Sequence, residues 1–379
     1  MRRMRNHVRS LPGIALAATG IIFTCTALLR AEPAAPALTE IASFGTPYPV
    51  DALAFHPDGR QLAAASYARA GMAQVWDWRA ERKFPVAFGN RDNMNMLAAD
   101  AIGYSPDGHL FAWCGNGERV WDAANGQLLF DRSTGPGVAQ CTGARFAPDG
   151  KTLVQALVSH GDRFTDVAAR DAATGVIAWQ ITSHEFLADG MALSADSSRL
   201  AVGGRWQGEG ESRQQVRIFD LAGRLLALTI EALPPVPQTA AAASASIARV
   251  AWSPDGTRIA VGLRDTAADG LPALKIFDAR SGALLDEEAG PRGTQVRGIC
   301  FSPDGRYLAV LGIGRRTRVW DGGHTRLLQE IRVNPASCAT SADSRYLALG
   351  GAARGLGSLN PLLGLILPDS GKVRVYELP

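Results

Sequence analysis

The chain has 379 residues, of which 46% are hydrophobic and 20% are charged, a composition typical of a globular protein and not of a disordered one. Its formal net charge of +3 arises in residues 1–31, which hold five arginines and no acid. Removing those five from the 39 basic residues leaves 34 against 36 acids, a net charge of −2. Residues 32–379 therefore give no overall electrostatic case for binding nucleic acid.

The first 31 residues have the pattern of a targeting segment. A stretch with four arginines precedes the 16-residue apolar run Ile14–Leu29, and small residues follow from Ala31 onward. This order is typical of secretory signal peptides. We expect a signal peptide over residues 1–31, cleavage near Ala31, and export to the periplasm or extracellular space of a bacterium. The alternative is an uncleaved membrane anchor, because the apolar run counted from Leu11 approaches the roughly 20 residues that span a bilayer.

A repeated pattern dominates residues 32–379. Five copies read aromatic residue, small residue or His, Pro, Asp, Gly, and two worn copies end in Ser; they begin at Phe55, Tyr104, Phe146, Leu193, Trp252, Phe301 and Thr340. Each is followed by a step such as Val75-Trp-Asp77, with Ala169-Arg-Asp171 as the weakest match. A unit that cannot bury its own apolar face must stack on copies of itself. We therefore expect one domain of seven stacked repeats over residues 32–379.

Each repeat resolves into four short strands rich in Val, Ile and aromatic residues. In the fifth repeat the expected strands are Ala248–Ser253, Arg258–Leu263, Ala273–Asp278 and Ala283–Glu287. The corner between the first two has a physical basis, because Pro254 presets φ, Asp255 bonds the nearby backbone and Gly256 adopts a left-handed conformation. The Asp after the aromatic residue is expected to accept amide protons at the next corner. We assign these residues no catalytic role.

These motifs resemble those of WD40-repeat β-propellers, and the Ser-Pro-Asp-Gly corners also resemble those of periplasmic propellers of the Tol-system type. Trp76-Asp77, Trp121-Asp122 and Trp320-Asp321 match the dipeptide that ends a WD40 repeat. The Gly-His pair of that family is missing, so its buried hydrogen-bond relay is not carried over. The resemblance implies an all-β fold, a seven-bladed β-propeller of four-stranded antiparallel blades.

The ring needs a closing strand. The last repeat ends at Val373–Leu378, its third strand, and the strand-like run Leu38–Phe44 precedes the first repeat. We expect this N-terminal strand to complete the last blade, because it would cover an edge that otherwise invites aggregation.

The two edges of such a ring differ. We call the edge with the strand 2 to strand 3 turns and the interblade connections the upper face, and the opposite edge the lower face. Every long connection belongs to the upper face: Asn90–Asp100, Arg132–Gln140, Arg205–Gln215, Glu231–Ile247, Arg264–Pro272 and Arg354–Lys372. One-sided elaboration is typical of a binding face, although drift in loops is the alternative.

Arginines recur just past the second strand of the repeats and predict a basic rim on the upper face that attracts an acidic protein partner. With Trp206 as an interface anchor, the predicted partner-binding residues are Arg69, Arg205, Trp206, Arg264, Arg315 and Arg354. An arginine-rich composition alone is the alternative explanation of this pattern. For Trp206 the alternative is packing against the next blade. The apolar stretch Leu356–Leu367 either folds back over the channel mouth or forms an exposed patch for a partner or for peripheral contact with a membrane.

Four cysteines remain after the first 31 residues: Cys114, Cys141, Cys300 and Cys338. The propeller arrangement brings Cys114 near Cys141 and Cys300 near Cys338, each pair on neighbouring blades. Bridging requires Cα atoms within about 7 Å, which neighbouring blades reach only sometimes. We expect four buried free thiols, with these two bridges as the alternative.

No sequence motif indicates a metal site, haem attachment, a phosphate-binding loop or a nucleophile elbow. We therefore expect no cofactor and a monomeric, non-catalytic interaction or scaffold propeller that binds a partner through its upper face. The alternative is a periplasmic propeller enzyme (a hydrolase, lactonase or dehydrogenase) whose site lies in the channel mouth, because propeller enzymes need no linear motif.

Overall fold

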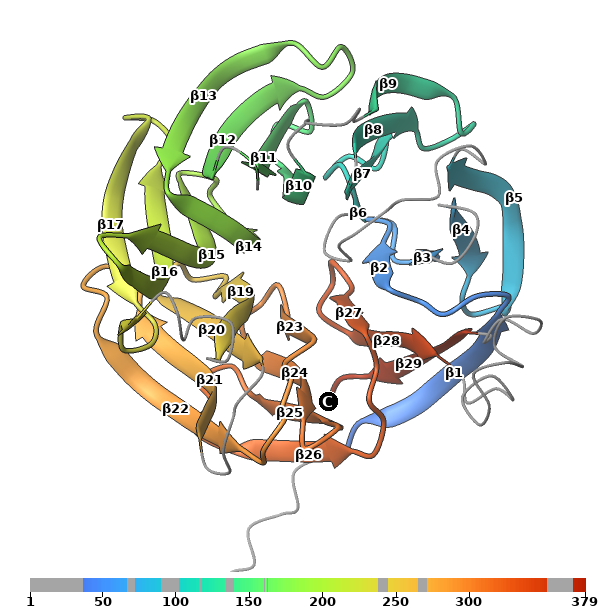
Figure 1. Cartoon of the computed structure of the whole chain (residues 1–379). Coiled ribbons are helices and arrows are strands. Elements are labelled where there is room, and N and C mark those ends of the chain that lie inside the picture. Colours follow the sequence, from blue (N-terminus) through green and yellow to red (C-terminus); the bar gives the residue numbers. More distant parts are fainter. Residues whose placement is uncertain are drawn as a thin grey trace, which may run out of the picture. The chain divides into compact units, whose positions relative to one another are not determined.

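Seven four-stranded antiparallel sheets, the blades, stand around a common axis in the computed structural model (Figure 1). The structure describes residues 37–66, 72–89, 102–115, 117–133, 140–159, 161, 163–237, 245–264, 271–352 and 371–379. The expected targeting segment at residues 1–31 lies outside them. No helix in these ranges is long and apolar enough to cross a membrane.

The blades follow one another in chain order. Blade 1 consists of β2 (Ala52–Phe55), β3 (Gln61–Ser66), β4 (Met72–Asp77) and β5 (Arg82–Gly89), and blade 2 of β6 (Ile102–Tyr104), β7 (Leu110–Gly115), β8 (Gly117–Asp122) and β9 (Leu128–Ser133). Blade 3 consists of β10 (Gln140–Phe146), β11 (Thr152–Ser159), β12 (Phe164–Asp171) and β13 (Ile177–His184), and blade 4 of β14 (Phe186–Leu193), β15 (Arg199–Gly208), β16 (Glu211–Asp220) and β17 (Leu225–Glu231). Blade 5 consists of β19 (Ser246–Trp252), β20 (Arg258–Arg264), β21 (Leu271–Asp278) and β22 (Leu284–Gly290), and blade 6 of β23 (Gly298–Phe301), β24 (Tyr307–Ile313), β25 (Arg316–Asp321) and β26 (Leu327–Ile331). Blade 7 consists of β27 (Ser337–Thr340), β28 (Tyr346–Ala352), β29 (Gly371–Glu377) and β1 (Thr39–Thr46). A short strand, β18 (Val236–Pro237), pairs with β16 beside blade 4.

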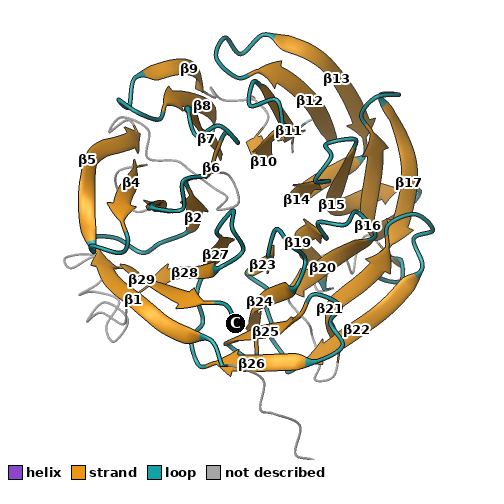
Figure 2. Ribbon diagram, turned by 180° about the vertical axis from the view of Figure 1, so that it is seen from behind, coloured by secondary structure: helices purple, strands orange, loops and turns teal. Residues whose placement is uncertain are grey.

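The first strand of each blade lies nearest the axis and the fourth lies outermost, as the view from behind shows (Figure 2). Second strands such as β20 are buried along most of their length, whereas the outer strand β22 is mostly exposed. This gradient explains why the second strands read as near-continuous apolar runs. They are covered by the neighbouring blades on both of their faces.

The closing strand is where the sequence predicts it. β1 pairs antiparallel with β29, from Thr39 opposite Glu377 to Thr46 opposite Gly371, and so becomes the outer strand of blade 7. Phe44 is 6% exposed, and its ring stacks on Trp76 of blade 1 with centroids 4.7 Å apart. The strand therefore completes one blade and packs against the next.

The corners also form as expected. In all seven copies the amide of the fifth motif residue donates to the carbonyl of the second, as in Gly256 to Ser253 and Ser197 to Ser194. The Asp accepts a further amide, as in Thr257 N–H to Asp255 Oδ1 at 3.0 Å. The worn copies keep the left-handed conformation without glycine, with φ of 54° at Ser197 and 60° at Ser344.

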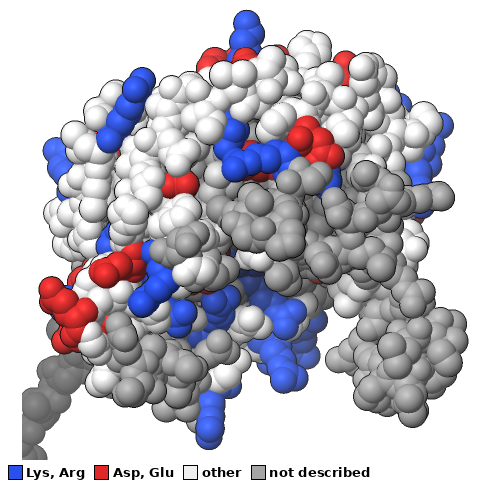
Figure 3. Space-filling view, turned by 45° about the horizontal axis from the view of Figure 1, so that its top comes forward, with Lys and Arg blue, Asp and Glu red and all other residues white. Residues whose placement is uncertain are grey.

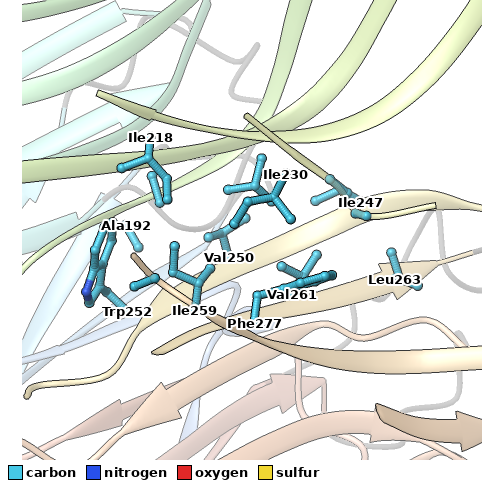
Figure 4. Packing of buried hydrophobic residues seen from close by; sticks show 14 residues of the cluster. Ala192, Ile218, Ile230, Ile247, Val250, Trp252, Ile259, Val261, Leu263 and Phe277 are labelled. Atoms are coloured by element: carbon cyan, nitrogen blue, oxygen red, sulfur yellow. The ribbon is translucent and has the colours of Figure 1, made fainter. Parts of the chain in front are cut away.

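The core lies between the blades. In the contact of blades 4 and 5, Ile218 and Ile230 of blade 4 meet Val250 and Ile259 of blade 5 (Figure 4). Burying one such aliphatic side chain is worth about 1.5–3 kcal/mol. Each blade thus depends on its neighbours for the apolar burial that stabilises it.

The expectation of four free thiols is wrong, because both alternative bridges are present. Cys114 is bonded to Cys141, with Cα atoms 5.3 Å apart, and Cys300 to Cys338, with Cα atoms 6.3 Å apart. Each bridge joins consecutive blades, blade 2 to blade 3 and blade 6 to blade 7. Their Cα distances lie within the range that a disulfide requires, so neighbouring blades do approach closely enough at these positions.

Blades 2 and 3 share buried charges as well as a bridge. Glu118 on β8 is 1% exposed, and its carboxylate lies 3.1 Å from Arg170 Nε on β12. Burial raises the pKa of Glu118, while the positive charges of Arg170 and Arg132 oppose that rise. A buried ion pair fixes the relative position of two elements more surely than it adds stability, so we regard this pair as part of the blade contact.

Candidate partner-binding face

The lower face is uniform and the upper face is not. On the lower face every described turn between strands has four or five residues and the repeated corner chemistry. On the upper face the described connections range from the single residue Glu185, between β13 and β14, to the tight turn of the long β15–β16 hairpin and the segment that joins blade 6 to blade 7. Chain variation is therefore concentrated on one face of the ring.

A groove opens on the upper face between blades 6 and 7. Its volume is about 750 Å³, and it is lined by Arg315, Arg332, Val333, Asn334, Pro335, Leu349, Gly351, Ala352, Lys372 and Arg374. Four of these ten residues are basic and none is acidic. We call this site the blade 6–7 groove.

Two connections and the start of one strand place the basic side chains. Arg315 sits in the tight turn between β24 and β25, with φ of 61°. Arg332 follows β26 in the interblade segment, and Lys372 lies near the start of β29, opposite Gly351. A Cβ at Gly351 would lie 3.1 Å from the Pro335 backbone, so glycine lets the interblade segment approach β28 closely.

The basic residues differ in how their charge is compensated. Arg374 forms an ion pair with Glu40 of β1 at 3.5 Å. Arg315, Arg332 and Lys372 are exposed, and none of the three forms an ion pair with another residue in the described ranges. The groove consequently carries a local excess of positive charge. Lys and Arg side chains are not spread evenly over the molecular surface. Figure 3 shows several of them close together below the centre of the view.

The structure separates the predicted rim residues. Arg315 lines the groove. Arg264 instead donates to Asp189 Oδ1 at 2.9 Å and to Ser246 Oγ at 2.9 Å, so its charge is compensated by a bond to blade 4. Arg69 and Arg354, like the stretch Leu356–Leu367, lie outside the described residues.

The segment around Trp206 is a strand, where a loop was expected. Arg205 and Trp206 belong to β15, and Trp206 lies opposite Phe186 on one side and Arg213 on the other. Trp206 is half-buried against the core between blades 3 and 4, with the Arg213 guanidinium 5.8 Å from its ring. Alternation along a long hairpin, and not a mobile loop, therefore orients these side chains.

Arg332, Lys372 and Arg374 are not among the predicted rim residues. The predicted rim consists of residues just past the second strand, whereas these three lie in an interblade connection and on a third strand. The signal for Arg332 was the segment Arg332-Val-Asn-Pro-Ala336, which follows the outer strand of blade 6 on the same face as Arg315. Combining the connections of adjacent blades would have brought the two together.

A second cavity, of about 80 Å³, lies at the ring centre and is lined by residues from the first strand of every blade. Arg145 and Arg249 line it at positions where the other blades carry mostly small residues. Arg249 Nε donates to the Arg297 carbonyl at 2.9 Å. No Asp, Glu or His lines this cavity, and the described residues contain no group of three side chains suited to hold a metal ion.

Comparison with known families agrees with the fold. Residues 39–77 and 286–321 match the family described as WD domain, G-beta repeat. These matches cover less than half of the chain, and together with the ring of seven blades they support a propeller of the WD40 type. No curated protein matches the chain.

Proposed function

We propose that this propeller is a non-catalytic interaction module that binds a protein partner through its upper face. The observation that carries the proposal is the blade 6–7 groove, where three exposed cations have no ion-pair partner among the described residues. Unpaired cations in a groove attract a partner of opposite charge and raise its rate of association. Propellers of the WD40 type commonly mediate protein interactions, which is consistent with this role.

We also propose that the ring works outside the cytoplasm, as a monomer. Two disulfides support an oxidising compartment, and the signal-like segment at residues 1–31 is consistent with export. Sequencing the amino terminus of the purified native protein tests this idea. A terminus near residue 32 supports cleavage and export, whereas an intact residue 1 supports the membrane anchor.

Affinity capture with variants of each face tests the function. The ring, residues 32–379, is immobilised as the unchanged chain, as an upper-face variant (Arg315→Ser, Arg332→Ser, Lys372→Ser), as a second upper-face variant (Trp206→Gln, Arg213→Gln), and as a lower-face variant (Arg199→Ser, Arg280→Ser). We expect a protein that the unchanged and lower-face chains retain and that at least one upper-face variant loses. A partner lost equally from both faces, or from neither, contradicts the proposal.

A further inference from the structure

We propose that the blade 6–7 groove accepts an extended, carboxylate-rich segment of the partner protein, with an apolar side chain against the groove floor. This inference rests on the proposed function and names the chemistry of the partner. It is supported by the composition of the groove, the contacts that already engage Glu40, and the contrast with a groove on the opposite face.

The charges in the groove come from separate elements and converge. Arg315 stands on blade 6, Lys372 on blade 7, and Arg332 on the segment between them. Glu40, the acid that pairs with Arg374, also accepts a hydrogen bond from the Tyr376 hydroxyl at 3.1 Å. Its carboxylate is therefore already engaged by two residues of β29, at the ring seam formed by β1 and β29. Like charges held close together repel one another, and an anionic segment between them relieves that repulsion.

The floor of the groove favours a peptide over a small anion. Val333, Pro335, Leu349 and Ala352 provide apolar surface between the basic side chains. The volume of about 750 Å³ falls within the range of sites that enclose whole ligands, roughly 300–1,000 Å³. Carboxylates on the rim and one apolar side chain on the floor would use both kinds of surface.

Nucleic acid fits the groove less well. None of the ten lining residues is aromatic, whereas single-stranded nucleic acids are bound largely by stacking of their bases on aromatic rings. The net charge of −2 over residues 32–379 also disfavours a long polyanion. A short acidic segment needs only local positive charge.

The lower face offers a matched control. A groove of about 590 Å³ between blades 4 and 5 contains Asp196, Asp255 and Asp278 beside Arg199 and Arg280. It is similar in size but mixed in charge, and its acids are engaged in corner hydrogen bonds. An acidic segment that selects the upper groove therefore responds to charge, and not to groove size.

The lysines make the site easy to locate. The chain holds four, Lys83, Lys151, Lys275 and Lys372. Only Lys372 lies in the groove, while Lys151 is exposed in a lower-face turn. Carbodiimide joins a carboxylate to a lysine amine in direct contact, so a coupled peptide reports where its carboxylates bind.

The probe is a synthetic decapeptide of alternating Glu and Leu. The control is a peptide in which Gln replaces every Glu. Fluorescence titration measures the binding of both peptides to the unchanged ring. After carbodiimide treatment of the Glu peptide, mass spectrometry identifies the modified lysine. We expect coupling at Lys372 and little at Lys151. In the Arg315→Ser, Arg332→Ser variant, which keeps Lys372, we expect about fivefold weaker binding and coupling, because two exposed charge pairs with the peptide are lost. The Arg199→Ser, Arg280→Ser variant should match the unchanged ring.

Three results would overturn the inference: coupling spread over Lys151 and Lys372 alike, binding that ignores the Arg315 and Arg332 changes, or displacement of the peptide by an equal concentration of single-stranded oligonucleotide. Each of them leaves the capture experiment unaffected. A partner lost only from the Trp206 and Arg213 variant would refute this groove while supporting the upper face. If no protein is captured although the peptide couples selectively to Lys372, the proposed interaction function is refuted, and only the binding of acidic peptides by the groove is supported.

Discussion

His324 joins blades 5 and 6 near the outside of the ring. The side chain is buried, with Nδ1 2.7 Å from Asp286 Oδ2 and Nε2 3.3 Å from Glu288 Oε2, and its ring lies 4.2 Å from that of Trp320. Burial by itself lowers the pKa of His324, but the hydrogen bonds to Glu288 and Asp286 outweigh it and raise the pKa above its usual value. When protonated, the imidazole can donate to two carboxylates of the neighbouring blade at once.

The His324→Ala change should therefore destabilise the ring in a pH-dependent way. A raised folded-state pKa adds stability that is fully present below the unfolded value of about 6.5 and is lost as pH rises through the folded value. We expect a loss of about 1–2 kcal/mol near pH 6 that shrinks at higher pH. Urea unfolding at several pH values measures it, with His109→Ala at an exposed turn as control. A loss that grows with pH would refute the link.

The two worn corners provide a second test at single residues. Ser197→Gly removes left-handed strain worth about 1 kcal/mol, which the greater freedom of glycine in the unfolded chain partly offsets. We expect a gain of a few tenths of a kcal/mol on that basis. Ser344→Gly should gain less or lose stability, because Ser344 Oγ accepts the Asp304 amide of blade 6 at 2.9 Å. Thermal unfolding compares the two, and equal gains would contradict the role given to that hydrogen bond.

At the scale of elements, the closing strand β1 matters most. Deleting residues 37–46 removes the buried side chains of Leu38 and Phe44 and exposes the edge of β29. We expect a loss of more than about 5 kcal/mol, comparable to the stability of a typical domain, and therefore aggregation. A chain that begins at residue 37 is the control. Size-exclusion chromatography and melting decide, and a soluble monomer with unchanged melting would exclude closure by this strand.

The disulfides hold two blade contacts together. After denaturation without reductant, residues 32–379 should show no reactive thiol, while the full chain should show one, Cys25. The bridges close loops with sequence separations of 27 and 38 residues. Each should stabilise the ring by roughly 3–4 kcal/mol through the unfolded state. Thiol titration and melting of Cys→Ser variants measure both effects, and four reactive thiols would remove both bridges.

For the whole molecule, repetition made the fold predictable. The seven Pro-Asp-Gly or Ser-Ala-Asp-Ser corners predicted where the first two strands of every blade lie. The last blade ended at its third strand, around Val375, so a fourth strand had to come from elsewhere, and β1 supplies it. Such features are local, so they can be read from one sequence. The bridges were harder, because blade twist and spacing decide whether the Cα atoms of Cys300 and Cys338 come within reach.

The candidate site was predicted only in part. Its face followed from the one-sided connections, and Arg315 was among the residues named. Charge compensation is a property of three-dimensional neighbours, and the sequence could not show that Asp189 would pair with Arg264 across a blade contact. It also could not show that Arg332 and Lys372, 40 positions apart, would line one groove. Arginine composition alone treats all of these residues alike.

The register of the ring seam has a mechanical consequence. Thr39 lies opposite Glu377, so the two described ends of the ring meet at the same end of the β1–β29 pair. Tension applied through both ends would separate the pair one hydrogen bond after another, as a zipper opens, and would not shear all of them at once. A tether at one end leaves the seam unloaded. The ring can thus be held by either end without loading its seam, whereas a pull through both ends acts on one hydrogen bond at a time.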